Sequence, residues 1–359
     1  RKFSPDGHIL WEYRNLWPGR NMDTTVLDKG ALYSVSSDGV AYALNIENGN
    51  LLWKTKACDD LHEDNGFQNV MDGVLVIATD SKDSQFSRIV RALNATDGSQ
   101  LWMYRPDTNL WNFGQFYPGD GTLLFQDISG KVYRMKIQTG ELIWKNGGNP
   151  GTWTDGTMTL GPNNVAYAVS TRDWFAAGLV DSKGDLRAHR VSDGHLLWER
   201  EMARVPNVAP AVGKLYNRTT FSVVQAVGQQ VRQGGDTYVY ALDAESGELQ
   251  WTFSGPLQKG KWQAGDAEGM ETRSVALGRA TCLPNPWSAP TIDAAGTVYL
   301  GNQEGPLYAL RDTNGDGRVE GPDEVSSYDT LAAFAGSASP VLGPGMLAVA
   351  SCDSLFVFK

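Results

Sequence analysis

One stretch of the chain decides its fold: Tyr238-Val-Tyr-Ala-Leu-Asp-Ala-Glu-Ser-Gly-Glu-Leu-Gln-Trp251. Val239 and Ala241 alternate with their neighbours at a period of two, which is typical of a half-buried strand. Ser246-Gly247 is turn chemistry, because glycine adopts positive φ without steric cost. A second short apolar run follows the turn and ends at Trp251. The stretch therefore predicts a strand, a tight turn and a second strand.

The same Gly-x-x-x-Trp spacing recurs along the chain, at intervals of 42 to 54 residues between tryptophans. An Asp, Asn, Ser or Thr precedes each glycine, and Leu or Ile precedes the tryptophan in five of the six copies. This interval is typical of propeller blades. The copies are Gly7/Trp11, Gly49/Trp53, Gly98/Trp102, Gly140/Trp144, Gly194/Trp198 and Gly247/Trp251.

The run Ala-Leu-Asp-Ala-x-x-Gly-x-x-x-Trp resembles the tryptophan-docking repeat of the PQQ-like, or quinoprotein dehydrogenase-like, β-propellers. The resemblance covers nearly the whole chain. It implies that each tryptophan locks one blade onto the next. It is specific for the fold and weak for function, because one fold of this kind supports many functions.

We therefore predict an all-β protein in which residues 1–359 form a single β-propeller domain of four-stranded antiparallel blades. Seven blades are expected, and an eighth within 254–287 is the alternative. The N-terminal strand is expected to complete the C-terminal blade and so remove an exposed sheet edge. The predicted blades span 22–54, 70–104, 118–145, 162–199, 208–253, 288–328, and 338–359 together with 1–12.

In this repeat the four strands of a blade are lettered A to D from the central channel outward. Strand direction then sorts the loops into two faces: the D–A and B–C loops share one, which we call the top face, and the A–B and C–D turns share the other, the bottom face. The long loops 171–185 and 219–237 and the insertion 254–287 all belong to it. Long loops in a compact domain are usually functional or disordered. Aromatic residues in the top-face loops, both these three and the shorter ones, predict either packing around the channel or a stacking platform for a small planar or polar ligand. The candidates are Trp111, Phe113, Trp153, Trp174, Trp262 and Trp287.

An acidic segment, residues 312–324, has the Asp-x-Asn-x-Asp-Gly pattern of a calcium loop. Calcium takes six to eight oxygen ligands, including a main-chain carbonyl at the seventh position of such a loop. Either Asp323 or Glu324 would close the site. We expect a structural calcium ion on the bottom face. The candidate ligands are Asp312, Asn314, Asp316, Arg318 through its carbonyl, Glu320, Asp323 and Glu324.

Composition limits the classes of binding partner and the cellular compartments that we expect for this protein. The net charge of −10 argues against a nucleic-acid ligand, and no apolar run reaches the length of a membrane helix. We expect an exported, secreted or periplasmic monomer. Of the three cysteines we expect Cys282 to bridge to Cys352, with Cys58 left over. A Cys58–Cys282 bridge, or three reduced thiols in a cytosolic protein, are the alternatives.

Two functions remain open from the sequence. The first is a non-enzymatic propeller that binds a ligand or protein partner through its top face, since the resemblance includes outer-membrane assembly scaffolds. The second is a small quinoprotein-type oxidoreductase acting on alcohols or sugars, with PQQ as cofactor. The sequence has neither the adjacent Cys-Cys pair of the larger enzymes nor a Cys-x-x-Cys-His haem motif. No catalytic residue can be carried over, and the first function is favoured.

Overall fold

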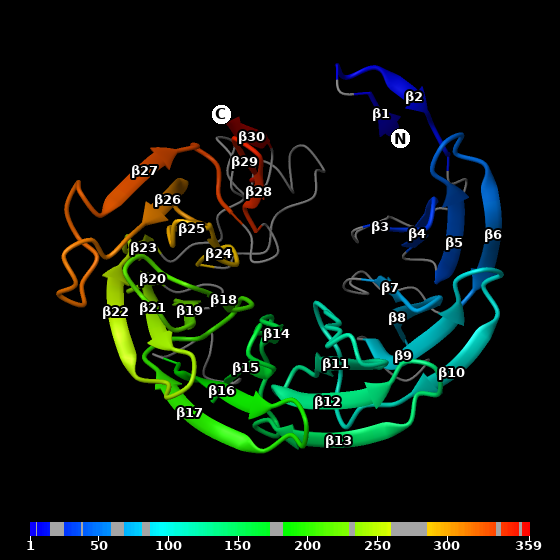
Figure 1. The fold of residues 1–359 in the computed structure, drawn as a ribbon, viewed down its shortest axis with the longest axis horizontal. Coiled ribbons are helices and arrows are strands. Elements are labelled where there is room, and N and C mark those ends of the chain that lie inside the picture. The colour runs from blue at the N-terminus through cyan, green and yellow to red at the C-terminus, as the bar shows by residue number, and fades with distance from the viewer. Residues whose placement is uncertain are drawn as a thin grey trace. The chain divides into compact units, whose positions relative to one another are not determined.

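The computed structural model contains strands and no helix in the residues it describes (Figure 1). The strands pair into antiparallel sheets, so the predicted all-β class is confirmed. The chain divides into two compact units, one of residues 1–127 and 133–145 and the other of 128–132 and 146–359, which are described separately. The described residues are 1–4, 6–14, 25–36, 39–58, 68–80, 87–172, 182–229, 234–259, 286–334, 339–351 and 354–359.

The first unit contains two four-stranded sheets and an N-terminal hairpin. The hairpin pairs β1 (Lys2–Phe3) with β2 (Ile9–Trp11). The first sheet has the order β3 (Val26–Asp28), β4 (Ala31–Val35), β5 (Val40–Asn45) and β6 (Leu51–Lys56). The second has the order β7 (Asn69–Met71), β8 (Val74–Asp80), β9 (Ser87–Asn94) and β10 (Gln100–Tyr104).

A three-stranded sheet contains residues of both units. Its order is β11 (Thr122–Gln126), β12 (Lys131–Lys136) and β13 (Leu142–Gly147). A single bridge between Phe116 and Leu124 stands where the other sheets have their first strand. This is the region that the sequence predicts to be the shortest blade.

The second unit contains three four-stranded sheets, one three-stranded sheet and a short pair of strands. The first sheet is β14 (Thr159–Leu160), β15 (Val165–Thr171), β16 (Gly184–Arg190) and β17 (Leu196–Met202). The next is β18 (Ala211–Gly213), β19 (Ser222–Val227), β21 (Tyr238–Asp243) and β22 (Leu249–Ser254). The third is β24 (Thr291–Ile292), β25 (Val298–Gly301), β26 (Pro306–Leu310) and β27 (Val325–Asp329). The remaining strands are β28 (Val341–Gly343), β29 (Met346–Ala350) and β30 (Leu355–Phe358), and the pair β20 (Gly234–Gly235) and β23 (Gln258–Lys259).

The second strands of two sheets, β15 and β19, are buried on both faces. Every residue of β15 and of β19 is buried, although the side chains of a strand alternate between the two faces. A sheet covered on both faces reads as a continuous apolar run, which is how residues 165–169 read in the sequence. Pro210 and Pro290 directly precede β18 and β24, where a missing N–H group costs least.

Four tryptophans of the repeat make the same pair of contacts, each within one unit. The indole N–H donates to a carbonyl three residues before the next glycine of the repeat, and the ring lies against that glycine. The bonds are Trp11 to Ile46 (2.9 Å), Trp53 to Ala95 (2.8 Å), Trp102 to Ile137 (2.7 Å) and Trp198 to Ala244 (3.2 Å). The glycines they cover are Gly49, Gly98, Gly140 and Gly247.

Several features of the predicted propeller stay predictions. Among the described residues β1 pairs with β2, and β28–β30 form their own sheet, so the blade count and the closure by the N-terminal strand are not decided. Cys58 is buried. Cys282 and Cys352 lie outside the described residues, as does most of the insertion 254–287.

Candidate functional site

A long acidic loop joins β26 to β27, at the position where the other sheets have a short turn before their outer strand. The connection runs from Arg311 to Glu324, and it replaces both the glycine and the tryptophan of the repeat. It belongs entirely to the second unit.

The first half of the loop is folded on its own side chains. The buried carboxylate of Asp312 accepts the N–H of Gly315 at 2.8 Å. The Asn314 side-chain oxygen accepts the N–H of Asp316, and the Asp316 carboxylate accepts the N–H of Arg318, each at 2.8 Å. Such side-chain to main-chain bonds are typical of Asp and Asn in turns. They fold residues 312–318 into consecutive tight turns.

Glu324 closes the loop from its other end. Its carboxylate is buried and accepts the N–H groups of Thr313 at 2.8 Å, Asn314 at 3.1 Å and Glu320 at 3.1 Å. Burial alone would raise the pKa of this carboxyl, but the three main-chain donors outweigh it and the pKa of Glu324 lies below its usual value. The neighbouring Asp323 is exposed. The structure thus turns Glu324, and not Asp323, into the loop.

The loop is attached to the outer strand β22 of the preceding sheet. The N–H of Thr252 donates to the carbonyl of Gly317 at 3.1 Å, and the N–H of Val319 donates to the carbonyl of Thr252 at 2.9 Å. Val319 is buried in the same apolar cluster as Trp251. The arginine Arg218 reaches Asp312 at 3.4 Å from the side.

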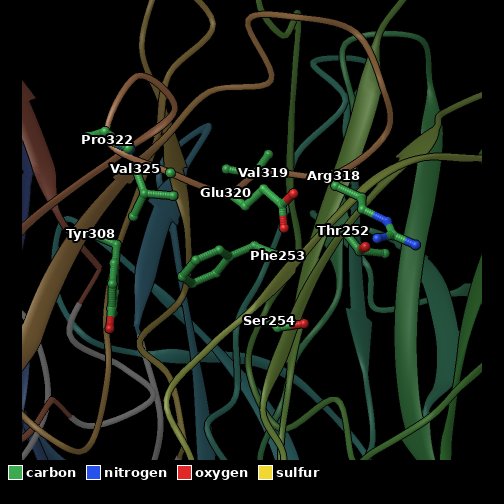
Figure 2. Close-up of a pocket in the computed structure, with 10 residues that line it drawn as sticks. Thr252, Phe253, Ser254, Tyr308, Arg318, Val319, Glu320, Pro322 and Val325 are labelled. Atoms are coloured by element: carbon green, nitrogen blue, oxygen red, sulfur yellow. The ribbon is translucent and has the colours of Figure 1, made fainter.

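A pocket of about 720 Å³ opens beside this attachment (Figure 2). Its walls come from β22, from β26, from the second half of the acidic loop and from the first residue of β27. The lining residues are Thr252, Phe253, Ser254, Tyr308, Arg318, Val319, Glu320, Gly321, Pro322 and Val325.

The pocket is lined by two aromatic side chains, Phe253 and Tyr308, and by two side chains of opposite charge, Arg318 and Glu320. The ring centroids of Phe253 and Tyr308 lie 5.2 Å apart. In the view of Figure 2 the Glu320 carboxylate lies between Phe253 and the guanidinium group of Arg318, with Tyr308 beyond Phe253. Burial, together with the negative charge of Asp329, raises the pKa of Tyr308, so this phenol stays neutral. The lining therefore combines aromatic surface with one negative and one positive side chain.

The predicted aromatic candidates fall into three groups. Phe113 and Trp287 are buried: Phe113 packs on Phe125 with centroids 5.4 Å apart, and the Trp287 indole donates to the carbonyl of Val227 at 3.1 Å. Trp111 and Trp153 are partly exposed. Trp174 and Trp262 lie outside the described residues.

The metal candidates are brought together only in part. Asp312, Asn314, Asp316 and Glu324 take part in the hydrogen bonds of one loop, whereas Glu320 lines the pocket and Asp323 is exposed. Within the described ranges no three Asp, Glu, His or Cys side chains form a group that could hold a metal ion. A calcium site here would therefore depend on Asn314 and on main-chain carbonyls as well as on carboxylates.

Sequence reasoning missed the pocket. One signal was available, because the sheet that follows Trp251 lacks the Gly-x-x-x-Trp pattern and Gln250 replaces the usual Leu or Ile. Both departures lie at this junction. They did not indicate that Glu320 would line a cavity.

No helix of the described residues is both long and apolar enough to cross a membrane.

Comparison with known proteins gives relatives of two kinds. The outer membrane protein assembly factor BamB of Yersinia pestis is 26% identical over 250 residues, 66% of this chain and 57% of its own length. The tetrathionate hydrolase of Acidithiobacillus ferrooxidans is 22% identical over 261 residues, 65% of this chain and 48% of its own length. The chain thus spans about half the length of these curated relatives.

Solved structures share the fold. The crystal structure of BamB from Moraxella catarrhalis has a TM-score of 0.59 at 15% identity, covering 93% of this chain and 81% of its own. A europium-containing methanol dehydrogenase has a TM-score of 0.58 at 13% identity, covering 90% and 73%. At these identities the likeness concerns the fold alone.

The model of one family matches residues 1–152 and 166–338, which is most of the sequence. The repeat predicted from the tryptophan spacing is therefore confirmed as that of the PQQ-like propellers. The chain belongs to the family described as outer membrane protein assembly factor BamB.

Proposed function

We propose that this protein is an exported, non-enzymatic propeller that binds a protein partner in outer-membrane assembly. The observation that carries the proposal is the family match over residues 1–152 and 166–338, whose description is that of an assembly factor. Periplasmic location and a monomeric chain complete the proposal. The net charge of −10 favours a partner with basic surface groups over nucleic acid.

The top-face loops are the surface that we assign to this partner. Trp111 and Trp153 lie on two of them and are partly exposed, while Phe113 is withdrawn into the core. Tryptophan is enriched among the residues that carry binding energy at protein interfaces, since it covers a large area at little entropic cost. We expect each of these two residues to contact the partner.

The test is site-specific photo-crosslinking in the cell envelope of the source organism. A photoreactive phenylalanine analogue is placed at Trp111 or Trp153, and in matched controls at Leu52 or Leu101, which are exposed on outer strands. We expect the loop positions to crosslink to a component of the outer-membrane assembly machinery and the controls not to do so.

Two results would overturn the proposal. One is equal crosslinking from loops and outer strands. The other is a bound quinone in the absorbance spectrum of the purified protein, or dye-linked oxidation of alcohols or sugars after PQQ and calcium are added. The second result would establish the quinoprotein-type oxidoreductase instead.

We further propose that the acidic loop holds a structural calcium ion. The oxygen donors of Asp312, Asn314, Asp316 and Glu324, with the Arg318 carbonyl, match the hard-cation preference of calcium. Hydrogen bonds to the main chain of the same loop hold the side chains of Asp312, Asn314 and Asp316 in place. The ion would fix the loop against β22 by joining its two ends. Glu320, which lines the pocket, and exposed Asp323 are weaker ligand candidates.

A further inference from the structure

A buried histidine of the second unit lies where one strand ends against the turn of the next sheet. His189 of β16 is fully buried, and its Nδ1 lies 3.2 Å from the carbonyl oxygen of Gly194. The side-chain amide of Asn146, near the end of β13, donates to the same carbonyl oxygen at 2.8 Å. The ring also lies against Gly147, because a Cβ atom there would come within 2.9 Å of the ring nitrogen Nε2. The end of β13 and the turn after β16 therefore meet at one imidazole ring.

The contacts of the two ring nitrogens fit a neutral imidazole. A carbonyl oxygen can only accept a hydrogen bond, so Nδ1 of His189 carries the proton and Nε2 keeps its lone pair. Nε2 is buried and has no hydrogen-bond partner among the described residues. Protonation would place an N–H group without an acceptor, and a positive charge, in the interior of the protein. Both cost free energy, because neither the N–H group nor the charge would be solvated.

The charged groups around the ring do not offset such a charge. Arg187 lies two residues earlier on the same strand, on the same face, and would repel a second cation. Glu199 of β17 would attract it, but its carboxylate is bonded to Arg187 at 2.9 Å. On the facing sheet, Lys131 of β12 is a cation as well. The charged residues next to the contacts of the ring are themselves paired: Arg190 with Asp193 at 2.9 Å, Asp185 with Arg172 at 2.7 Å and Lys145 with Asp107 at 2.5 Å.

The end of β13 leads directly into a loop that is held by main-chain hydrogen bonds. The N–H of Asn149 donates to a carbonyl of the segment 128–129 at 2.8 Å, and the N–H of Thr154 donates to the other carbonyl of this segment at 2.9 Å. Trp153, which the proposed function assigns to the partner, lies between these two bonds. Movement at Gly147 would therefore act first on the bond of Asn149 and then on the loop that carries Trp153.

We propose that His189 is a pH-sensitive latch, which holds residues 147–154 against β16 while its ring is neutral and releases them into a locally open state when the ring is charged. In the open state water reaches the ring and solvates the imidazolium. Burial is the largest cause that lowers the pKa of His189 in the closed state, so the open state takes up the proton first. The open population therefore rises as the pH falls below about 6.5 and is constant above it.

The latch concerns the chain alone, whereas its effect on a partner bound at Trp153 rests on the proposed function. Hydrogen exchange of the full 359-residue chain tests the latch without a partner. Exchange of the main-chain amides is measured at pH 7.5 and pH 5.5 and corrected for the pH dependence of the intrinsic rate. We expect the open population at Asn149 and Thr154 to be about tenfold larger at pH 5.5. The amide of Val319, which is bonded to Thr252, is the internal reference and should not follow this rise.

Three variants make the test specific. His189→Gln keeps a donor for the Gly194 carbonyl and cannot gain a proton, so the rise between pH 7.5 and 5.5 should disappear. His195→Gln is the matched control, because His195 lies on the same turn and is exposed, and it should keep the tenfold rise. Asn146→Ala removes the second bond to Gly194 and should increase the open population equally at both pH values. Matching melting temperatures at pH 7.5 establish that each variant is folded.

An equal open population of Asn149 and Thr154 at the two pH values in the wild-type chain would overturn the latch. So would the same rise in His189→Gln, or a rise at Val319 as large as at Asn149, which would indicate unfolding of the whole unit. An NMR titration of the His189 ring that gives a pKa at or above 6.5 would also refute it. Failure of the crosslinking at Trp153 would leave these results unchanged, so the two proposals fail separately.

Discussion

Two connections of the second unit occupy the same place in their sheets and are built differently. The turn between β21 and β22 is the short Asp243–Gly247 unit, against which Trp198 of the preceding outer strand lies. The connection between β26 and β27 is the acidic loop. Its buried Val319 belongs to the same apolar cluster as Trp251, and the loop makes two main-chain bonds with Thr252. Trp251 is 2% exposed, whereas Trp198 is half-buried.

The comparison teaches that the repeat can lose its glycine contact if another element covers the tryptophan. The short turn needs a glycine because a Cβ atom at residue 247 would approach Trp198 within 2.7 Å. The loop covers Trp251 with a buried valine instead and bonds the main chain of Thr252. Residues 318–322 of the same loop line the pocket, so the pocket lies where the loop replaces the turn.

The largest expected effect is on the covered tryptophan. Trp251→Ala should lower the free energy of unfolding by about 3–5 kcal/mol, the range for a fully buried large aromatic residue. Trp198→Ala should cost less, because its ring is partly exposed and leaves a smaller cavity. Denaturant titration of both variants measures the difference. A larger loss for Trp198→Ala would show that the short turn, and not the loop, makes the stronger junction.

The second prediction is that calcium stabilises the protein through the acidic loop and not through the short turn. If the loop binds the ion, calcium at about 100 times its Kd should stabilise the fold by about 2.7 kcal/mol relative to a chelator, since the unfolded chain does not bind it. Asp312→Asn with Asp316→Asn should abolish this difference. Asp243→Asn is the matched control, because Asp243 caps the short turn with similar main-chain bonds. An unchanged melting temperature after verified metal removal would refute the site.

Glycine-to-alanine substitutions compare the two connections by adding one methyl group to each. Gly247 and Gly315 have nearly equal positive φ, +72° and +77°, but a Cβ at residue 315 meets nothing within 4 Å. Both alanine variants should pay the backbone cost of about 1–2 kcal/mol. Gly247→Ala should lose about 1–3 kcal/mol more, because its methyl group overpacks against Trp198. Equal losses in thermal or denaturant unfolding would mean that the ring moves aside freely.

The smallest expected effect concerns pH, at another short turn. His189 is fully buried, and its Nδ1 lies 3.2 Å from the carbonyl of Gly194. Burial lowers its pKa, with a small further decrease from Arg187, against opposing effects of the Gly194 carbonyl and Glu199. The unfolded chain therefore takes up the proton first as the pH falls. Stability from this group is complete above about pH 6.5 and declines below it.

His189→Gln should accordingly flatten the fall in unfolding free energy between pH 7.5 and 5.5, because glutamine can donate to Gly194 without titrating. Unfolding titrations at several pH values measure the slopes. Identical slopes for wild type and variant would show that the ring gains a proton without cost in the folded protein.

Much of the architecture could be predicted from the sequence because its causes are local. Alternation and turn chemistry predicted a strand, a tight turn and a second strand within residues 238–251, and the structure has strands at Tyr238–Asp243 and Leu249–Ser254. The glycine of each short turn could be identified because positive φ is a property of one residue. The repeat spacing then gave the family, since identical units that stack must recur at a fixed interval.

The tertiary structure decided what each loop side chain does. Sequence left Asp323 and Glu324 equivalent, and the fold buries one and exposes the other. Trp287 and Trp153 were equal candidates, but Trp287 packs in the core beside Phe253 and Tyr308. The contact of Val319 with Thr252 joins segments far apart in the chain and depends on how whole sheets pack. No pattern within a few residues encodes such a contact, so the pocket that it opens could be found in the folded protein alone.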